Sequence, residues 1–308
     1  MTVGEVGEFE VIAQITARLG QAKHVILGPG DDAAVIAAAD GRVVATTDLL
    51  VEGRHFRTDW SSGYDIGRKA AAQNLADIAA MGAVPTALLV GLACPPATAV
   101  DWIDLLTDGL RDESALTGAA VAGGDVVRAE QVMVAVTALG DLQGRAPVTR
   151  SGARAGEVVA VCGRLGWAPA GLAVLGRGFR SPAAVVAAHR RPEPPYAQGP
   201  LAASAGATAM IDISDGLTQD LAHIAAASGV AIDVQRAALE VPQRLIDVGA
   251  ALGVDPYVWV LGGGDDHALA ATFGGPVPPG WRVIGSVAAG DGVTVDAEPY
   301  VAGHDHFL

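Results

Sequence analysis

TAMIDISDGLTQDLAHI, residues 208–224, is the stretch that decides how this chain folds. Its first part is apolar and predicts a buried strand that ends near Ile213, and its second part predicts an amphipathic helix from Leu217 onward. Asp212 and Asp215 lie where the strand changes into the helix. Carboxylates at the end of a strand, next to a helix N-terminus, are well placed to hold Mg²⁺ beside a bound phosphate.

A simpler interpretation of the same residues is helix capping. Ser214 or Asp215 would then be the N-cap of the helix, because Ser and Asp are preferred at that position for reasons unrelated to ligands. For this stretch taken alone, the cap is the more frequent explanation. Recurrence of the pattern elsewhere in the chain shifts the balance toward a site.

Five places share an apolar run, small residues and an aspartate: Asp31 with Asp32, Asp48, Asp125, Asp212 with Asp215, and Asp265 with Asp266. A further carboxylate, Asp77, lies three residues after Asn74 on one face of an expected helix, 64–81. That face is either solvated, which is the more frequent case for polar residues, or part of a site. Carboxylates that converge are costly without cations, so the set favours Mg²⁺ ions around a polyphosphate.

Composition limits the function classes. The 308 residues suffice for two domains or one large one, and 51% are hydrophobic. A net charge of -14 disfavours binding to nucleic acid or to an anionic membrane surface. Cys94 and Cys162 end apolar runs and are expected to be buried, inert thiols. We expect a cytoplasmic protein, because neither a leader-like N-terminus nor an apolar run of about 18 residues is present.

The order of expected elements favours an α+β or mixed α/β fold over a regular parallel array. A polar, Gly-rich and basic segment, 141–156, is expected to separate two domains, 1–145 and 146–308. Its Arg150 could reach a phosphate, although a solvated linker is the more frequent explanation. The expected helices are 8–19, 64–81, 100–116, 168–176, 181–190, one from 217, and 242–252, and the expected strands are 25–27, 43–48, 86–93, 119–122, 132–139, 157–162, 208–213, 231–234, 267–273, 282–287 and 293–296, with a further apolar run at 258–261.

Several familiar nucleotide and hydrolase motifs are absent. The chain contains no GxxxxGK[ST] loop, no GxGxxG after the first strand, no HExxH and no GxSxG. If the chain uses ATP, it therefore does so with glycines and aspartates rather than with a lysine cradle.

The motifs together resemble the thiamine-monophosphate kinase family, within the superfamily of aminoimidazole ribonucleotide synthetase. They are GPGDDAAV at 28–35, TTDLLVEGRHF at 46–56, NLADIAAMGA at 74–83, AGGDVVR at 122–128, TRSGARAGE at 149–157, IDISDGL at 211–217, LGGGDDHAL at 261–269 and GHDHF at 303–307. The resemblance spans the whole chain and implies a two-domain α/β fold. It further implies that the N-terminal domain binds ATP and Mg²⁺ and dimerises through its sheet, while the C-terminal domain completes an active-site cleft.

The resemblance also implies transfer of the ATP γ-phosphate to thiamine monophosphate, in line and without a general base, giving thiamine diphosphate and ADP. Several Mg²⁺ ions are expected, with K⁺ as a further candidate cofactor. The implied Mg²⁺ ligands are Asp32, Thr46, Thr47, Asp48, Asp77, Asp125, Asp212 and Asp215. The implied ATP contacts are Gly124, Asp125, Arg150 and Ser214, and the implied contacts to the thiamine substrate are His55, Asp265 and His304.

Two departures from the family pattern concern the acceptor. Where the family commonly has GGEDYEL, Asp265 replaces a Glu and Ala268 replaces a second Glu, and His304 stands where an aromatic usually precedes DHF. Other readings are a selenophosphate synthase, disfavoured by the lack of an N-terminal Cys, and a hydrogenase maturation factor, disfavoured by the lack of a C-terminal Cys. A cation or nucleotide sensor without activity is disfavoured because all the metal positions are retained.

Overall fold

The computed structural model describes residues 1–6, 8–20, 22–27 and 34–304. Among the implied ligands, Asp32 lies outside the described residues, as does His306 in the GHDHF motif. The chain divides into two compact units. The first unit comprises Met1–Ile78 and Ala83–Gly144, and the second comprises Ala79–Gly82 and Arg145–Leu308.

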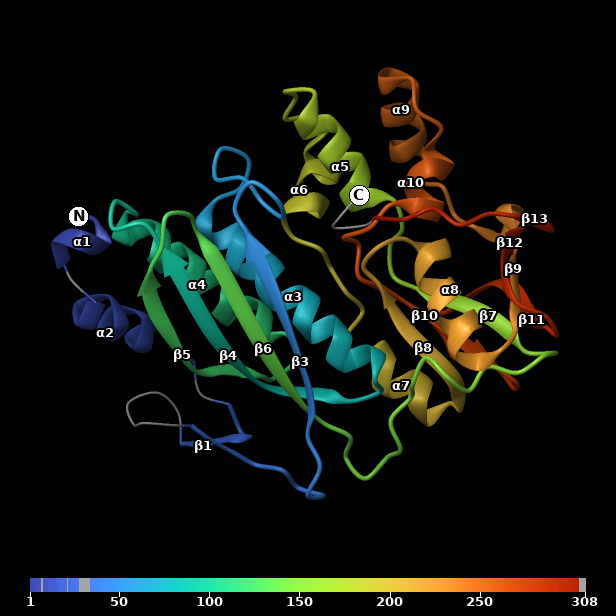
Figure 1. Cartoon of the computed structure of the whole chain (residues 1–308), viewed down its shortest axis with the longest axis horizontal. Helices are drawn as coiled ribbons and strands as arrows, with labels where there is room; N and C mark the ends of the chain where they lie inside the picture. The colour runs from blue at the N-terminus through green and yellow to red at the C-terminus, as the bar shows by residue number, and fades with distance from the viewer. Residues whose placement is uncertain (7, 21, 28–33, 305–308) are drawn as a thin grey trace. The chain divides into compact units, whose positions relative to one another are not determined.

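The first unit contains a four-stranded sheet in the order β3-β6-β4-β5, in which β4 and β5 are parallel and the other pairs antiparallel. Helices α3 and α4 lie along one face of this sheet (Figure 1). A short antiparallel pair, β1 and β2, follows the N-terminal helices. The elements are α1 Val3–Val6, α2 Glu8–Arg18, β1 Val25–Leu27, β2 Val35–Ile36, β3 Val44–Val51, α3 Gly63–Ala80, β4 Val84–Cys94, α4 Val100–Ala115, β5 Ala120–Arg128 and β6 Met133–Asp141.

Helices α3 and α4 approach each other through glycines. A Cβ on Gly67 would lie 2.1 Å from the Leu106 carbonyl oxygen, and a Cβ on Gly109 would lie 2.2 Å from the Tyr64 carbonyl oxygen. No side chain fits at either position without moving a backbone. The glycines therefore set the distance between the two helices that cover the sheet.

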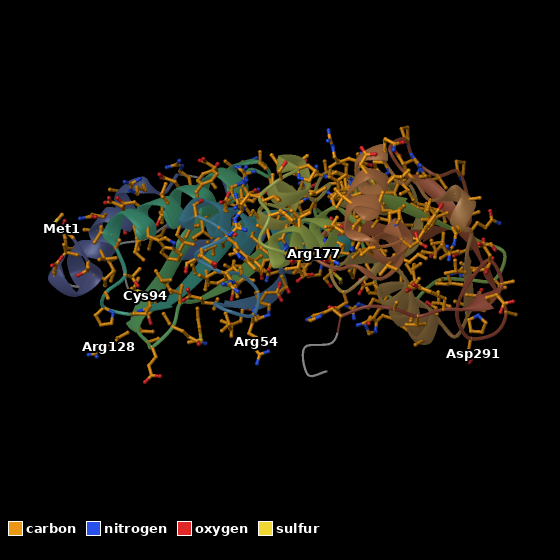
Figure 2. All side chains as sticks on the ribbon, turned by 90° about the horizontal axis from the view of Figure 1, so that it is seen from above. Met1, Arg54, Cys94, Arg128, Arg177 and Asp291 are labelled. Carbon is orange, nitrogen blue, oxygen red and sulfur yellow. The ribbon has the colours of Figure 1, made fainter. Side chains whose placement is uncertain are left out.

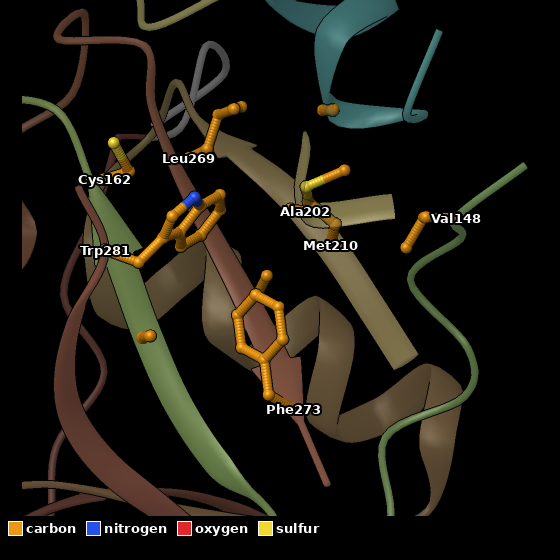
Figure 3. Packing of buried hydrophobic residues seen from close by; sticks show 10 residues of the cluster. Val148, Cys162, Ala202, Met210, Leu269, Phe273 and Trp281 are labelled. Atoms are coloured by element: carbon orange, nitrogen blue, oxygen red, sulfur yellow. The ribbon is translucent and has the colours of Figure 1, made fainter. Parts of the chain in front are cut away.

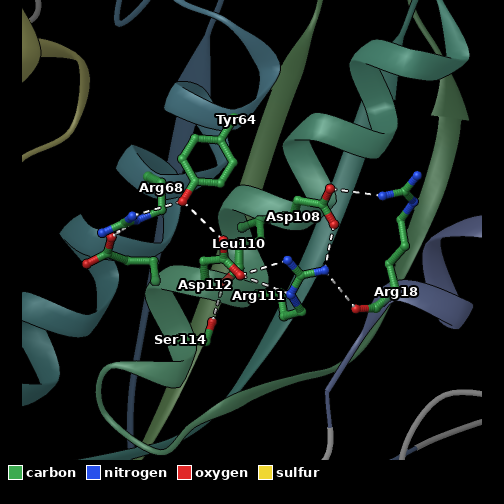
Figure 4. A network of polar contacts seen from close by, with 9 residues as sticks. Arg18, Tyr64, Arg68, Asp108, Leu110, Arg111, Asp112 and Ser114 are labelled. Carbon is green, nitrogen blue, oxygen red and sulfur yellow. Dashed lines mark hydrogen bonds and ion pairs between the residues drawn. The ribbon is translucent and has the colours of Figure 1, made fainter.

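Ion pairs hold α2 and α3 to α4 (Figure 4). Arg18 of α2 donates to Asp104 at 2.7 Å and to Asp108 at 2.9 Å. Arg68 of α3 pairs with Glu113 of α4, whose side chain is 1% exposed. Burial of a carboxylate is costly unless it has a partner, and Arg68 supplies the partner of Glu113.

The second unit contains a seven-stranded sheet in the order β13-β12-β9-β11-β7-β10-β8, antiparallel except for the β12 and β9 pair. Phe273, Trp281 and Met210 lie in its core cluster (Figure 3), and the two rings meet edge to face at 5.5 Å. The elements are β7 Val158–Cys162, α5 Trp167–Gly176, α6 Ala183–Arg190, α7 Gln198–Ser204, β8 Ala207–Ile213, α8 Leu217–Ser228, β9 Ala231–Val234, the 3-10 helix η1 Arg236–Ala238, α9 Gln243–Leu252, α10 Pro256–Gly262, β10 Ala268–Phe273, β11 Arg282–Ala288, β12 Gly292–Val295 and β13 Glu298–Pro299.

Two expectations about where strands end were wrong. The strand expected to stop at Ala122 continues through Gly123, Gly124 and Asp125 to Arg128, because it pairs in parallel with β4 over this length. Asp48 lies inside β3 rather than at its end. The apolar run 258–261, which was not assigned to a helix or a strand, lies in α10, since Asp255 caps this helix by accepting the Tyr257 N–H and Pro256 occupies its first turn.

The two cysteines are free and buried, as the sequence predicted. Cys94, which is labelled in Figure 2, is the last residue of β4. Burial is the main cause that raises the pKa of both thiols. Within the part of the chain that the structure describes, no single helix is long and apolar enough to cross a membrane. Helices α9 and α10 meet that criterion only as a pair bent by 116°.

Candidate active site

In the first unit, Thr46 and Asp77 join β3 to α3. The Thr46 hydroxyl donates to Asp77 Oδ2 at 2.7 Å. Thr46 and Asp48 are two residues apart on a strand and are both half-buried, so they lie on the same face of the sheet. The structure therefore brings three of the implied metal ligands to one side of β3. Asn74, on the same helix as Asp77, is fully buried, so the solvated-face interpretation is wrong for it.

Thr47 points to the opposite face of the sheet. It is exposed, donates to the Val136 carbonyl oxygen at 3.1 Å and accepts from the Thr137 hydroxyl at 3.0 Å. The structure therefore does not bring the Thr47 hydroxyl to Thr46 and Asp48.

Gly124 and Asp125 lie on β5, beside a cavity of about 720 Å³ in the first unit. A Cβ on Gly124 would lie 2.1 Å from the Val90 carbonyl oxygen, so only glycine fits here. Asp125 is exposed and accepts from the Val126 N–H at 2.9 Å. The other walls of the cavity are mostly aliphatic side chains of α2, α4 and β4. An apolar cavity with a carboxylate at its rim suits a ligand with a flat apolar part and a charged part.

His55 lies in a turn after β3 and is half-buried, not at the surface of an extended segment. Its Nδ1 accepts from the Val51 N–H at 3.0 Å, and its carbonyl oxygen accepts from Lys69 Nζ at 3.3 Å. Because Nδ1 accepts, the proton of the neutral ring is on Nε2. His55 therefore has a fixed tautomer and a fixed orientation.

In the second unit, the turn between β8 and α8 is held by Asp220 rather than by a conventional cap. Asp220 Oδ2 accepts from the N–H groups of Asp215 at 3.1 Å and Gly216 at 3.0 Å. The residue that precedes the helix is Gly216, so the prediction that Ser214 or Asp215 is the N-cap was wrong. Gly216 has φ of +139°, and a Cβ there would meet the Gly262 carbonyl at 2.7 Å. Ser214 is exposed and Asp215 half-buried, so both side chains remain available to a ligand.

Asp215, Asp220 and His223 have ligand atoms that all lie within 4.8 Å of one another. Burial, together with the charges of Asp212 and Asp215, raises the pKa of Asp220 to about 7, against the effect of the Gly216 and Asp215 N–H groups. Accumulated negative charge of this kind favours a cation. Sequence reasoning missed Asp220 and His223, although their three-residue spacing on α8 could have indicated them.

Asp265 lies between two buried imidazoles. Its Oδ2 is 3.7 Å from His189 Nδ1, and its Oδ1 is 3.9 Å from His267 Nε2. His267 Nδ1 in turn lies 3.0 Å from Asp212 Oδ2. The structure thus brings the implied metal ligand Asp212 and the implied acceptor contact Asp265 to the same imidazole. Sequence reasoning missed His189 and His267, because the contact of His267 with Asp212 and that of His189 with Asp265 each span 55 residues or more of chain.

Asp266, which the sequence grouped with Asp265 among the candidate carboxylates, has a structural role. Its carboxylate accepts from the N–H groups of Gly166 at 2.5 Å and Ala168 at 2.7 Å, at the start of α5. Burial raises the pKa of Asp266 to about 7, against the effect of these two N–H groups. Asp266 therefore acts as the cap of a helix that lies 100 residues earlier in the chain.

His304 and Arg150 lie at opposite ends of α8. The His304 N–H donates to the Asp215 carbonyl oxygen at 3.0 Å, which brings His304 to the start of the helix. The Arg150 carbonyl oxygen accepts from the hydroxyl of Ser228, the last residue of the helix. A helix of 12 residues is about 18 Å long, so the structure does not bring the Arg150 backbone to Ser214.

Comparison with known proteins identifies the family of the chain. Residues 30–142 match the family model described as AIR synthase related protein, N-terminal domain. The chain is 52% identical over 301 residues to a thiamine-monophosphate kinase of Mycobacterium tuberculosis, covering 97% of this chain and 90% of the relative. The chain belongs to the thiamine-monophosphate kinase family. A kinase of this family from Corynebacterium glutamicum is 42% identical over 306 residues, covering 96% of this chain and 91% of the relative.

Solved structures of this kinase family agree in fold. The structure of the kinase from Stenotrophomonas maltophilia K279a superposes with a TM-score of 0.83 at 32% identity, covering 96% of this chain and 98% of that chain. AaThiL complexed with AMPPCP and TMP gives a TM-score of 0.82 at 31% identity, covering 100% of this chain and 99% of that chain. The fold is therefore the mixed α/β fold of AIR synthase-related proteins, as the resemblance implied.

Proposed function

We propose that this chain is a Mg²⁺-dependent kinase that transfers the γ-phosphate of ATP to thiamine monophosphate, giving thiamine diphosphate and ADP. The observation that carries the proposal is 52% identity over 97% of the chain to a thiamine-monophosphate kinase. That match extends over both units of the chain. A cytoplasmic location is part of the proposal, because the reaction consumes ATP.

The side chains present fit Mg²⁺. This ion prefers oxygen ligands, and the described candidates supply carboxylate and hydroxyl oxygens, among which Thr46 and Asp77 are already joined at 2.7 Å. When bound, Mg²⁺ would neutralise phosphate charge. The residues proposed to hold it are Asp32, Thr46, Asp48, Asp77 and Asp125 in the first unit, and Asp212 and Asp215 in the second, while Thr47, whose hydroxyl points to the other face of β3, is left out. K⁺ is a further candidate cofactor.

The protein's own contribution to the reaction is binding and orientation. The attacking oxygen belongs to a phosphate that is already ionised at pH 7, so no side chain has to remove a proton from it. Alignment of donor and acceptor can then supply much of the rate enhancement. No described side chain therefore needs the role of a general base.

The substrate contacts are proposed as follows. ATP is contacted by Gly124 and Asp125 of β5 and by Ser214 and Arg150 of the second unit. Arg150 is exposed, and its guanidinium could bind a phosphate in a bidentate way. Thiamine monophosphate is contacted by His55, Asp265 and His304. Among these, Asp265 has the best-defined surroundings, because imidazoles flank both of its oxygens.

A homodimer that forms through the first unit's sheet is also part of the proposal. The face of β3 opposite Thr46 and Asp48 presents Leu49, which is 49% exposed. Leu89 of β4 is 38% exposed. Large aliphatic side chains on an open sheet face suit association with a second copy.

The decisive experiment measures ADP and thiamine diphosphate formed by the purified chain from Mg-ATP. Thiamine monophosphate, thiamine and an aminoimidazole ribonucleotide precursor are offered in parallel. We expect turnover with thiamine monophosphate alone and complete loss of turnover with EDTA. Turnover with another acceptor, or none with any, would overturn the proposed substrate.

A further inference from the structure

His189 and His267, to which the proposed function gives no role, form one connected group with Asp212 and Asp265. His267 and His189 are 5% and 6% exposed, and Asp212 is 4% exposed. The contacts run from His189 to Asp265 at 3.7 Å, from Asp265 to His267 at 3.9 Å, and from His267 to Asp212 at 3.0 Å. All four residues belong to the second unit.

The backbone holds His267 firmly in this position. Its N–H donates to the Ile213 carbonyl oxygen at 3.0 Å, and the Asp265 N–H donates to the Ser214 carbonyl oxygen at 2.8 Å. Both His267 and Asp265 have positive φ, at 52° and 73°. Such backbone is strained and persists only where the surroundings impose it. The turn that precedes β10 is therefore built to place these two side chains beside the end of β8.

His189 is positioned by close helix packing. His189 lies on α6. A Cβ placed on Gly171 of α5 would lie only 2.8 Å from the Cβ of His189. The absence of a side chain at Gly171 thus makes room for the imidazole. Its Nδ1 approaches the carboxylate oxygen of Asp265 that His267 does not approach.

The chemistry of the contact fixes the direction of the hydrogen bond. An ionised carboxylate can only accept, so His267 Nδ1 carries the proton that is donated to Asp212. A buried carboxylate without a donor would lose solvation without compensation, so this bond fixes the Asp212 side chain in one orientation. A donor behind a metal-binding carboxylate also orients it toward the ion.

We propose that His267 is a positioning residue. Its Nδ1 holds Asp212 for cation binding, and its Nε2 supports Asp265 for acceptor binding in the doubly protonated form of the ring, in which both nitrogens donate. The inference rests on the proposed function for the role of Asp265, but the link to Asp212 can be tested without turnover. His189 supports Asp265 from the other side. One imidazole thereby couples the metal ligand to the acceptor contact.

Two substitutions at His267 separate its contact with Asp212 from its contact with Asp265. In His267→Asn the amide nitrogen can replace Nδ1, so the bond to Asp212 is kept and the contact toward Asp265 is lost. In His267→Gln the amide nitrogen can replace Nε2, so the contact toward Asp265 is kept and the bond to Asp212 is lost. Asn also tolerates positive φ well, so the first variant should fold. His24→Asn makes the same chemical change in the first unit, to which neither Asp212 nor Asp265 belongs, and is the matched control.

The primary readout is Mn²⁺ binding followed by electron paramagnetic resonance, with Mn²⁺ alone as the probe. Asp212→Asn identifies the class of Mn²⁺ sites that depends on Asp212. We expect His267→Gln to weaken that class by about 10- to 100-fold, and His267→Asn and His24→Asn to bind it as the wild type does. Equal Mn²⁺ affinity in wild type and His267→Gln would overturn the link to Asp212.

The second readout is steady-state kinetics. We expect His267→Asn to raise the KM for thiamine monophosphate more than it lowers kcat, and His267→Gln to raise the Mg²⁺ concentration needed for half-maximal rate. If both variants changed the KM for thiamine monophosphate and the Mg²⁺ requirement in the same way, His267 would have a merely structural role. That result would overturn the assignment of Nδ1 to Asp212 and of Nε2 to Asp265. Failure of the proposed function would appear separately, as a wild type without kinase activity. The Mn²⁺ measurement would then still test whether His267 supports cation binding by Asp212.

Discussion

Asp212 is the residue on which the most chemistry depends, and its substitution is the first prediction. In Asp212→Asn the amide oxygen can still accept from His267 Nδ1, so the fold should be retained while the negative charge is lost. We expect kcat to fall by about 100-fold or more, with little change in the melting temperature. Turnover and thermal unfolding of the same preparation check this. Wild-type turnover in the variant would remove Asp212 from the metal site.

A second prediction concerns the stability contributed by Asp266. Burial raises its pKa to about 7 in the folded protein, above a value near 4 in the unfolded chain. Between about pH 4 and pH 7 the unfolded state therefore binds fewer protons than the folded state, and the free energy of unfolding falls as pH rises. The expected loss over this window is on the order of 4 kcal/mol relative to a variant that cannot titrate.

Asp266→Asn is that reference, because the amide oxygen keeps one acceptor for α5. Urea unfolding of both proteins at several pH values gives the difference between their free energies of unfolding. The contributions of other titrating groups are the same in both proteins and cancel in this difference. We expect the wild type to lose stability relative to Asp266→Asn as pH rises from 4 to 7. A difference that is constant, or that grows in favour of the wild type, would show that the two N–H groups keep Asp266 ionised.

At the scale of elements, the spacing of α3 and α4 yields a third prediction. In Gly67→Ala the new methyl group would overlap the Leu106 carbonyl oxygen at 2.1 Å, so the helices must separate. We expect a loss of about 1–3 kcal/mol in the free energy of unfolding. Gly176→Ala is the control, because that helical glycine has nothing within 4 Å of its Cβ position. There the substitution should be neutral or stabilise by about 0.5–1 kcal/mol.

The elements themselves were largely predictable from periodicity, and the errors have physical causes. Gly123 and Gly124 indicated a turn, but they are strand residues, and Gly124 is a glycine because β4 passes too close for a Cβ. The short helix α7 was missed because its seven residues carry too little pattern. Asn74 was expected to be more often solvated, yet its amide donates to the Ala70 carbonyl oxygen inside the core.

At the scale of the whole molecule, the open face of the first unit's sheet yields the last prediction. If two copies associate through it, Leu49→Lys places a charge in the interface and should give a monomer. Light scattering after size-exclusion chromatography measures the mass directly. Ile246→Lys, at a similarly exposed aliphatic residue of α9, should leave the mass unchanged. A wild type that is monomeric at micromolar concentration would contradict the proposed dimer.

The sequence by itself determined the family, the order of the elements and most of the candidate ligands. These depend on local patterns: an apolar run, a glycine turn and an aspartate lie within a few residues of one another. Asp212 and Asp215 could be selected because the change from strand to helix occurs between them.

Only the tertiary structure decided which side chains support those ligands. His267 reaches Asp212 because β10 pairs antiparallel with β8, in a register that sets Ala268 opposite Ile213. Asp266 caps α5 across 100 residues of chain, and His189 reaches Asp265 from another helix. Such contacts depend on how strands pair and helices pack, and no local pattern of residues encodes which partner is found.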